Sequence, residues 1–286
     1  MADQFGETGV AKRIIDPTDG LIVDIVGAWA SEKHERLRKY IDAAHGARAR
    51  YLRPRGMGGA AYIELFSGPG RSFVEDDKAF IDGSPLVAYK AAKKSRTNVS
   101  ELHFNDLESD NVDALHQRIA KLGGAASFYN DAAKKAVDKI IYALNPAGLH
   151  FAFLDPYNLQ GLPFSIIEKL ARLPRTDMLI HVSTFDLQRN LRRYLDDGRV
   201  LDAFMPGWRD RVDIKTTNQQ AIRAGLLSHW RGLIRNLGTS TAEAIELVSG
   251  PKGQRLYWLV FVSAHELGLR LWNDICNVNV QKRFDL

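Results

Sequence analysis

The chain has 286 residues, of which 45% are hydrophobic and 26% are charged. These proportions are typical of a globular protein and exclude a disordered chain, and the sequence contains no run of about 18 uncharged apolar residues that would predict a membrane span. The single cysteine, Cys276, excludes an internal disulfide and a zinc site built from cysteines. The N-terminal residues lack the apolar core of a signal peptide, so we expect a cytoplasmic protein.

The first 58 residues are predicted to form a helical extension that ends in a basic linker. Apolar side chains recur at three- and four-residue spacing from about residue 20 to residue 45, which predicts an amphipathic helix. Residues 53–59 are rich in Arg, Gly and Pro and form the expected linker. We therefore place the start of the main domain near residue 59 and assign residues 59–286 to it.

Strands and helices are expected to alternate through the first part of this domain. A helix is predicted to begin at Ser84-Pro85, and the segment 71–83 before it is expected to be a long acidic loop. The predicted strands are 60–66, 99–104, 126–129, 149–154 and 177–182.

This alternation predicts an α/β fold with a mostly parallel, doubly wound sheet. The segment from about 186 to 240 is helical, basic and aromatic in character, and we expect it to be a helical insertion over the strand ends. Two strands at 244–248 and 256–263 are predicted to close the sheet with an antiparallel C-terminal strand. Ligands of such sheets bind at the carboxyl ends of the strands.

The segment Tyr62–Ser72, YIELFSGPGRS, runs from a short apolar strand through Glu64 into a turn that holds Gly68 and Gly70. Glycine in such a turn lets backbone N–H groups approach a ligand closely. A P-loop requires Lys and Ser or Thr directly after its last glycine, and the dinucleotide fingerprint requires a small residue where Phe73 stands. S-adenosylmethionine (SAM) fits better, with Glu64 expected to contact its ammonium group. A turn with only a structural role is the alternative.

A SAM site also requires an acid after the second strand, for the ribose hydroxyls, and a polar group after the third, for the adenine amine. Asp106, with Glu108 as its near rival, stands at the first position and Asp131 at the second. Each acid also suits the start of a helix, as an N-cap or first-turn residue. The predicted cofactor-binding residues are Glu64, Phe66, Ser67, Gly68, Pro69, Gly70, Asp106 and Asp131.

The fourth strand ends in Asp155-Pro156-Tyr157. This triplet resembles the Asp-Pro-Pro-Tyr tetrad of enzymes that methylate exocyclic amines of adenine, with one proline fewer. We predict that the three residues are catalytic: the carboxylate and the proline carbonyl accept hydrogen bonds from the amine, and the ring stacks on the base. His181 ends the next strand and is a further candidate, whereas a simple strand-end turn is the alternative. The eight histidines show no metal-ligand spacing, so no metal site is expected.

The formal net charge of +5 favours a polyanionic partner. Basic residues gather in two zones, 36–55 and 189–215, on either side of the predicted site in the sequence. A solvated helix face is the alternative for each zone. With a nucleic-acid substrate, Tyr157 and Trp208 are candidates for stacking on an extruded base. The predicted nucleic-acid contacts are Arg53, Arg55, Arg189, Arg192 and Arg193.

Several motifs taken together resemble the three-Cys-motif partner (TcmP) family across most of the chain. They are WASEKH at 29–34, YIELFSGPGR at 62–71, DGSPL at 82–86, FLDPY at 153–157 and YWLVF at 257–261. The resemblance implies a fold similar to Rossmann-like SAM-dependent methyltransferases, a bacterial or phage-associated protein, and a partner protein with three clustered cysteines. This sequence has Tyr157-Asn158 where the family more often shows Phe-Gly, and Asp106 where it often has Glu.

The leading hypothesis is a SAM-dependent methyltransferase that modifies a nitrogen of a nucleic-acid base, in DNA or RNA, together with a three-Cys-motif partner. The alternative is a non-catalytic module of the same fold that binds nucleic acid or the partner, and the missing second proline favours it. An NAD-dependent enzyme is a third hypothesis, against which Phe73 argues.

Overall fold

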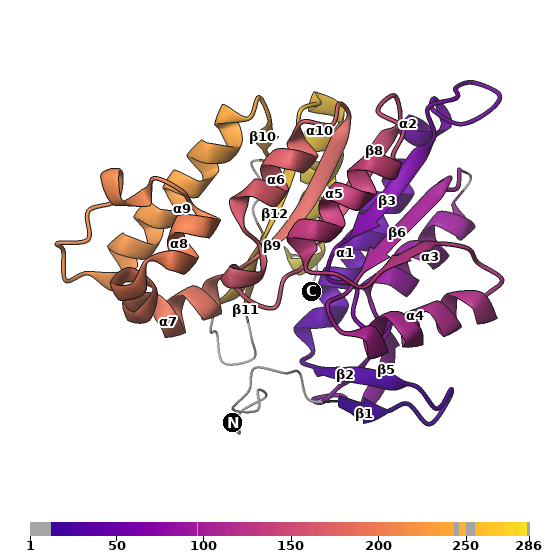
Figure 1. Cartoon of the computed structure of the whole chain (residues 1–286), viewed down its shortest axis with the longest axis horizontal. Coiled ribbons are helices and arrows are strands. Elements are labelled where there is room, and N and C mark those ends of the chain that lie inside the picture. Colours follow the sequence, from indigo (N-terminus) through magenta and orange to yellow (C-terminus); the bar gives the residue numbers. More distant parts are fainter. Residues whose placement is uncertain (1–12, 96, 243–245, 250–254, 285–286) are drawn as a thin grey trace. The chain divides into compact units, whose positions relative to one another are not determined.

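The computed structural model describes residues 13–95, 97–242, 246–249 and 255–284. The chain forms two compact units, an N-terminal unit of Met1–Ala132 and a C-terminal unit of Ala133–Leu286 (Figure 1). The domain boundary expected near residue 59 stays a prediction.

The N-terminal unit contains three parallel strands, β3 (Ala60–Glu64), β6 (Glu101–Asn105) and β7 (Ser127–Tyr129). All five residues of β3 are buried, so this strand is covered on both faces. Helix α3 (Ser84–Lys94) connects the hairpin that follows β3 to β6, and α4 (Ser109–Lys121) connects β6 to β7. Parallel strands joined in this way end at one edge, where their carboxyl ends meet.

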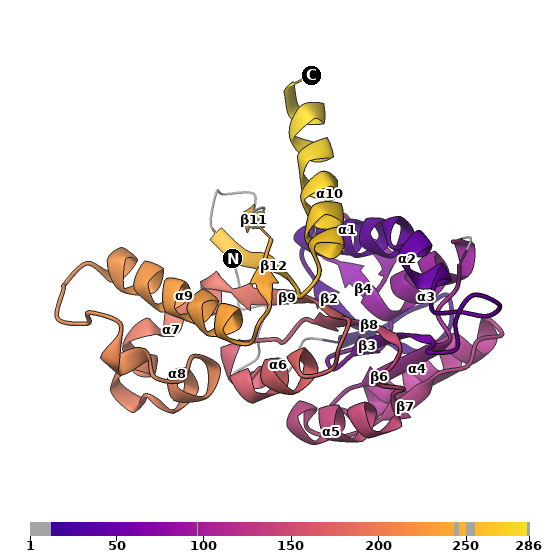
Figure 2. The ribbon, with the colours of Figure 1, turned by 90° about the horizontal axis from the view of Figure 1, so that it is seen from above.

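Two further helices of this unit precede β3. They are α1 (Trp29–Ala43) and α2 (His45–Ala49), and α1 packs against α3. Figure 2 shows α1, α2 and α3 beside one another. Leu37 and Tyr40 on α1 are fully buried, which explains the helical periodicity of this part of the sequence.

A second, four-stranded sheet also belongs to the N-terminal unit. Its strand order is β1 (Arg13–Ile15), β2 (Ile22–Val26), β4 (Arg71–Val74), β5 (Ala79–Asp82), and β2 and β4 run parallel. Two expectations were therefore wrong: the helix begins at Trp29 rather than near residue 20, and the segment 71–83 contains a β-hairpin rather than only a loop. Residues 22–26 are mostly β-branched, and pairing with β4 favours the strand.

The C-terminal unit begins with α5 (Ala133–Ala143) and continues with β8 (Leu149–Leu154), α6 (Phe164–Ala171) and β9 (Thr176–Ser183). Strands β8 and β9 are parallel, and β12 (Arg255–Ser263) pairs with β9 in the antiparallel direction. The short strands β10 (Ser240–Thr241) and β11 (Glu246–Ser249) pair with β12. The antiparallel C-terminal strand is therefore confirmed, while residues 244–245 of the strand expected at 244–248 lie outside the described residues.

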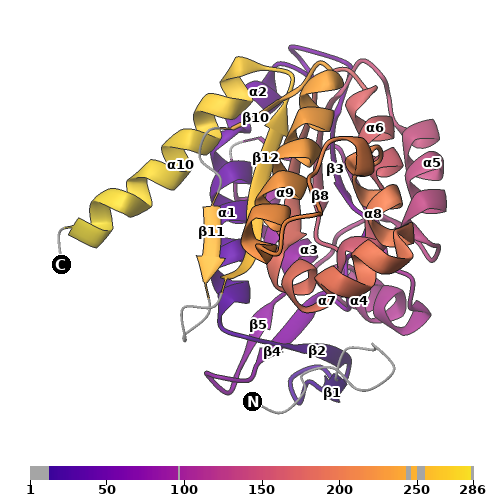
Figure 3. The same ribbon diagram turned by 90° about the vertical axis from the view of Figure 1, so that its left-hand side faces the viewer.

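The segment expected to be a helical insertion contains α7 (Thr184–Asp197), α8 (Arg199–Phe204) and α9 (Gln219–Asn236), followed after β12 by α10 (Glu266–Phe284). Figure 3 shows α7, α8 and α9 gathered in one group. The rings of Phe204 and Trp230 stack at 5.5 Å between centroids, and both residues are buried. Aromatic residues thus form the apolar interior of this helical group.

The predicted fold class is confirmed, because strands and helices alternate in the Rossmann-like order, the pairs β3–β6, β6–β7 and β8–β9 are parallel, and β12 is antiparallel to β9. Among the described residues, no helix is both long enough and apolar enough to span a membrane.

Candidate functional site

The glycine turn follows β3 at the carboxyl edge of the N-terminal unit's parallel strands. Gly68 and Gly70 have φ angles of 58° and 89°, a region that strongly favours glycine. The backbone N–H of Gly68 donates a hydrogen bond of 2.8 Å to Oδ2 of Asp106, which follows β6. The structure therefore brings together the turn and the acid that were predicted to share a cofactor.

The two glycines are required for different reasons. A Cβ on Gly70 would lie 2.7 Å from Cδ1 of Leu115 on α4, so the packing of that helix excludes a side chain here. A Cβ on Gly68 would instead lie 3.2 Å from a carboxylate oxygen of Asp24. Close packing of the protein therefore accounts for Gly70, whereas Gly68 faces a charged group.

Asn105, a residue that the sequence did not single out, connects the ends of three strands. Its buried side-chain amide donates to the carbonyl oxygens of Leu65 and Asp131, at 2.9 and 3.1 Å, and its Oδ1 accepts from the N–H of Asp131. Its own carbonyl accepts from the N–H of Ser67. The only signal in the sequence was an amide at the end of an apolar strand.

Asp106 is positioned by the start of α4 as well as by the turn. Its Oδ1 accepts from the N–H of Glu108 and from the side-chain amide of Asn111, both at 3.0 Å. Asp106 therefore acts as a residue at the start of a helix, and these contacts are compatible with its predicted role as a cofactor ligand. Asp131 is partly exposed beside it in the fold, held by its hydrogen bonds to Asn105.

Glu64 lies fully buried beneath the turn. Its carboxylate accepts hydrogen bonds from the hydroxyl of Tyr62, at 2.8 Å, and from the hydroxyl of Ser84, at 2.5 Å. Ser84 is the first residue of α3, so Glu64 joins β3 to the start of that helix. The predicted contact with a cofactor ammonium group stays a prediction, and the contacts seen here tie secondary-structure elements together.

The remaining residues of the predicted cofactor segment are mostly covered. Ser67 and Pro69 are buried and Phe66 is partly exposed. The carbonyl of Pro69 accepts a hydrogen bond of 2.6 Å from Arg118 on α4, whose guanidinium also pairs with Asp19 at 2.7 Å. Arg118 therefore holds the turn against the segment that joins β1 to β2.

Asp24 on β2 is the acid at this turn that the sequence analysis missed, because its segment was expected to be helical. The guanidinium Nε of Arg13 lies 3.5 Å from its Oδ1. Burial, reinforced by the negative charge of Asp106, raises the pKa of Asp24 to about 6, although Arg13 acts to lower it. The carboxylate of Asp106, at the end of β6, thus acts on that of Asp24 next to Gly68.

In the C-terminal unit, the carboxyl ends of β8 and β9 place Asp155 beside His181. The Nδ1 atom of His181 lies 3.5 Å from Oδ1 of Asp155, and its ring lies 4.3 Å, centroid to centroid, from that of Tyr257 on β12. The structure therefore places His181 beside Asp155, and its role in a catalytic site stays a prediction. Orientation of an imidazole by a carboxylate is a common arrangement for proton transfer.

Tyr157 is half exposed, at 49%, while Pro156 is buried. Partial burial raises the pKa of the Tyr157 hydroxyl to about 12, with Asp186 acting in the same direction and Arg189 against it. The segment after Tyr157 is fixed by Asp186, which accepts a hydrogen bond of 3.0 Å from the N–H of Leu159. The ring is thus presented from an anchored loop.

Exposed aromatic and basic side chains lie on α7. Phe185 is 37% exposed, and the guanidinium of Arg189 lies 5.6 Å from the centre of its ring. Arg192 and Arg193 on the same helix are exposed. Trp208, by contrast, is only 1% exposed and donates its indole N–H to Asp202, so the expectation that it stacks on a base was wrong.

The first basic zone is largely engaged within the protein. Arg48 is buried and donates to the carbonyls of Ile41 and Thr97, and Arg38 forms ion pairs with Glu35 and Asp42. Arg53 and Arg55, the residues predicted to contact nucleic acid, are exposed in the segment after α2. These two arginines belong to the N-terminal unit, and the basic residues of α7 belong to the C-terminal unit.

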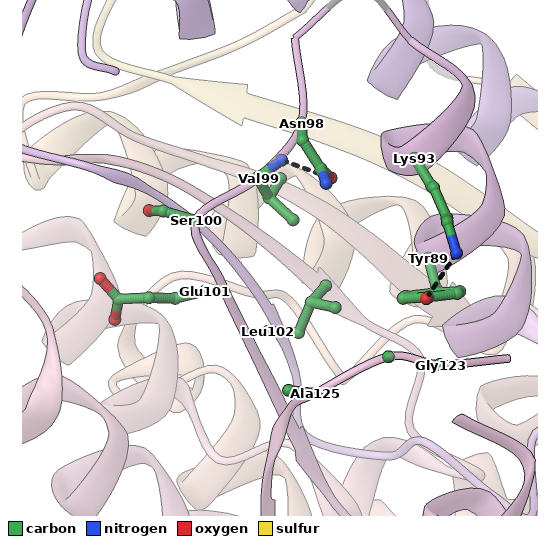
Figure 4. A pocket seen from close by; sticks show the side chains of 10 residues that line it. Tyr89, Lys93, Asn98, Val99, Ser100, Glu101, Leu102, Gly123 and Ala125 are labelled. Carbon is green, nitrogen blue, oxygen red and sulfur yellow. Dashed lines mark hydrogen bonds between the residues drawn. The ribbon is translucent and has the colours of Figure 1, made fainter. Parts of the chain in front are cut away.

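A small polar cavity of about 220 Å³ lies at the amino end of β6, the opposite end of the strand from Asn105. Figure 4 shows Lys93 reaching toward the hydroxyl of Tyr89 there. The ammonium group of Lys93 also donates to the carbonyl of Leu122 at the end of α4. These contacts join α3 to α4 and serve packing.

No family model matches the chain, and no curated protein matches it. The resemblance to three-Cys-motif partner proteins therefore stays a prediction.

Several solved structures are similar in fold to the chain. A Legionella pneumophila protein, LPL1258, has a TM-score of 0.49 at 10% identity, covering 83% of this chain and 90% of its own. The DszA carbon methyltransferase has a TM-score of 0.47 at 12% identity, covering 82% and 54%. TYW2 from M. jannaschii, solved in complex with AdoMet, has a TM-score of 0.41 at 9% identity, covering 89% and 85%.

Proposed function

We propose that this protein is a SAM-dependent methyltransferase. The observation that carries the proposal is the convergence, at the carboxyl edge of β3, β6 and β7, of a positive-φ glycine with Asp106, Asp131 and Asp24. Ligands of open α/β sheets bind outside the carboxyl ends of the strands, at this edge. The acceptor groups fit a cationic nucleoside, because two carboxylates that can accept from hydroxyl and ammonium groups, those of Asp106 and Asp24, lie against Gly68.

In this proposal, Asp106 and Asp131 bind the ribose and adenine ends of the cofactor, while the Gly68 turn lies against its amino-acid end. Bound SAM supplies an electrophilic methyl group. The protein's contribution is to hold its own groups in fixed positions, and the network around Asn105 does this for the turn and for Asp131.

For the substrate we propose a nitrogen of a nucleic-acid base, in DNA or RNA. Asp155 and the carbonyl of Pro156 accept hydrogen bonds from the target amine, and His181, with its Nδ1 3.5 Å from Asp155, helps to orient that carboxylate. The exposed ring of Tyr157 is the stacking group, and the arginines of α7 contact phosphates. Arg53 and Arg55 are proposed as further phosphate contacts. A three-Cys-motif protein is the proposed partner, on the strength of the sequence resemblance.

A non-catalytic module that binds nucleic acid or the partner protein is the second candidate. Two observations favour it. Packing against Leu115 accounts for Gly70, and Glu64 accepts hydrogen bonds from two hydroxyl groups of the protein. The turn is then a structural device.

Isothermal titration with SAM and S-adenosylhomocysteine decides between the two. We expect binding by the wild-type chain and a loss of at least about tenfold in Asp106→Ala, since hydrogen bonds to charged groups contribute about 1.5–3 kcal/mol. Asp110→Ala is the matched control, because Asp110 is an exposed acid in the first turn of α4. Circular dichroism verifies that each variant is folded. A wild-type chain that binds neither ligand contradicts the enzyme and supports the module.

The substrate is tested by transfer of tritium from labelled SAM to DNA and RNA oligonucleotides. Asp155→Ala is expected to abolish transfer and to leave the SAM titration unchanged, because Asp155 belongs to the substrate side of the proposal. Transfer that persists in this variant contradicts its role. A stable complex with a three-Cys-motif protein on size-exclusion chromatography tests the proposed partner.

A further inference from the structure

Asp24 has an unusual position beside the glycine turn. The register of β2 places it next to Arg13 of β1 and Ser72 of β4. Its Oδ2 lies 3.2 Å from the position that a Cβ on Gly68 would occupy, so the carboxylate faces the turn directly. Its buried Oδ1 faces the guanidinium of Arg13, whose Nε is 3.5 Å away.

Glu64 is the acid that the sequence predicts to bind the ammonium group. It differs from Asp24 in how accessible its carboxylate is to a ligand. Glu64 has no exposed surface, and hydroxyls of Tyr62 and Ser84 donate to both of its carboxylate oxygens. The side chain of Asp24 is 22% exposed, and its Oδ2 faces the glycine turn. Of these two acids, only Asp24 has exposed surface through which a ligand can reach its carboxylate.

We propose that Asp24 is the carboxylate that binds the ammonium group at the amino-acid end of SAM. This inference rests on the proposed function and replaces Glu64 in that role. A cation is the ligand group that the geometry favours, because a second carboxylate, Asp106, meets the same glycine through the hydrogen bond from Gly68. Two partly buried acids near each other are costly, and a bound ammonium group offsets that cost. A neutral ribose hydroxyl supplies no such compensation.

The charged groups acting on Asp24 agree with this assignment. Burial and Asp106 raise its pKa to about 6, while Arg13 opposes them, and its neighbour on β4, Ser72, is uncharged. The carboxylate is therefore ionised at neutral pH and protonated in mild acid. Binding of a cation to it must weaken as the pH falls through about 6.

Isothermal titration of wild type and Asp24→Asn with three ligands tests the inference. The ligands are SAM, S-adenosylhomocysteine and 5′-methylthioadenosine, which retains the adenosine and lacks the amino acid. We expect Asp24→Asn to weaken SAM and S-adenosylhomocysteine about ten- to a hundredfold, the range for one charge-assisted hydrogen bond, and to change methylthioadenosine less than about twofold. Asp77→Asn, an exposed acid in the turn between β4 and β5, is the matched control.

Each outcome separates the two proposals. Equal loss for all three ligands overturns the ammonium assignment and points to the ribose, and unchanged SAM affinity in Asp24→Asn overturns any role for Asp24 in the pocket. Both results leave the proposed function intact, since the wild-type chain still binds SAM. A wild-type chain that binds none of the ligands contradicts the proposed function, and the inference fails with it. Wild-type affinity that falls below pH 6, with a flat profile in Asp24→Asn, supports the inference independently.

Discussion

Replacing Asp24 by asparagine is expected to stabilise the free protein at neutral pH. Burial and Asp106 raise the pKa of this acid from 3.8 to about 6. A folded-state pKa above the unfolded value means that the folded chain retains a proton that the unfolded chain has released. Stability therefore falls as the pH rises from about 4 to about 6, and the loss persists at neutral pH. Asparagine carries no charge and avoids this loss.

The size of the effect follows from the shift. A change of about 2 pKa units at 1.36 kcal/mol per unit corresponds to about 3 kcal/mol at pH 7. The free energy of unfolding, measured with urea at pH 7.5 and pH 4, gives the test. Asp24→Asn should exceed wild type by about 3 kcal/mol at pH 7.5, and the difference should nearly vanish at pH 4, where Asp24 is mostly protonated in the folded chain.

Asp19, in the turn that joins β1 to β2, provides a control in which the expected effect has the opposite sign. Burial acts to raise its pKa, but hydrogen bonds from Arg118 and the N–H of Leu21 hold that pKa below the ordinary value. Asp19→Asn should therefore be less stable than wild type at pH 7.5. The reasoning is refuted if Asp24→Asn is less stable than wild type at pH 7.5, or if its advantage is the same at both pH values.

Three other predictions concern the site and the basic helix. Gly70→Ala should lower the free energy of unfolding by about 3–4 kcal/mol, since strain at positive φ adds to overlap with Leu115. Gly123 has a φ of 68° and no atom within 4 Å of the new methyl, so Gly123→Ala should lower it by only about 1–2 kcal/mol. Equal losses in the two variants contradict the packing argument. Asn105→Ala should cost about 2–4 kcal/mol, because it leaves buried backbone groups unpaired, and Asn130→Ala, whose hydrogen bonds are exposed, should cost clearly less; urea denaturation measures both. Replacing Arg189, Arg192 and Arg193 by alanine should reduce the slope of log K against log salt for oligonucleotide binding by about 2–3; an unchanged slope removes these residues from the interface.

The strands of the parallel sheet could be predicted because their signal is local. The run from Leu149 to Leu154 is almost wholly apolar, and β8 occupies those residues. The prediction for β2 failed for the opposite reason: the spacing of Ile22, Ile25 and Val26 is compatible with a helix as well as with a strand. Pairing with β4, which lies far along the chain, decides the outcome, and no local pattern encodes it.

The positions of the candidate site residues at the ends of strands could be predicted from the sequence. The contacts that their side chains make with other residues could be predicted less well. Gly68, Asp106 and Asp131 each follow a predicted strand, and this order was enough to predict that they lie at one edge of the sheet. The roles of Glu64 and Gly70 depend on Ser84 and Leu115, which reach them only through tertiary packing. Asp24 was missed because its strand was missed, and no sequence pattern separates the internally paired Arg38 from a free basic residue.

Hydrogen exchange measured by mass spectrometry, with and without SAM, tests the central claim most directly. The account predicts that SAM slows exchange in peptides covering residues 65–71 and 105–111, because the ligand covers the Gly68 turn and the start of α4 at Asp106. Protection should be weaker in Asp106→Ala at the same concentration of SAM. Unchanged exchange at saturating SAM, or protection confined to other segments, would contradict a cofactor site at this edge of the sheet.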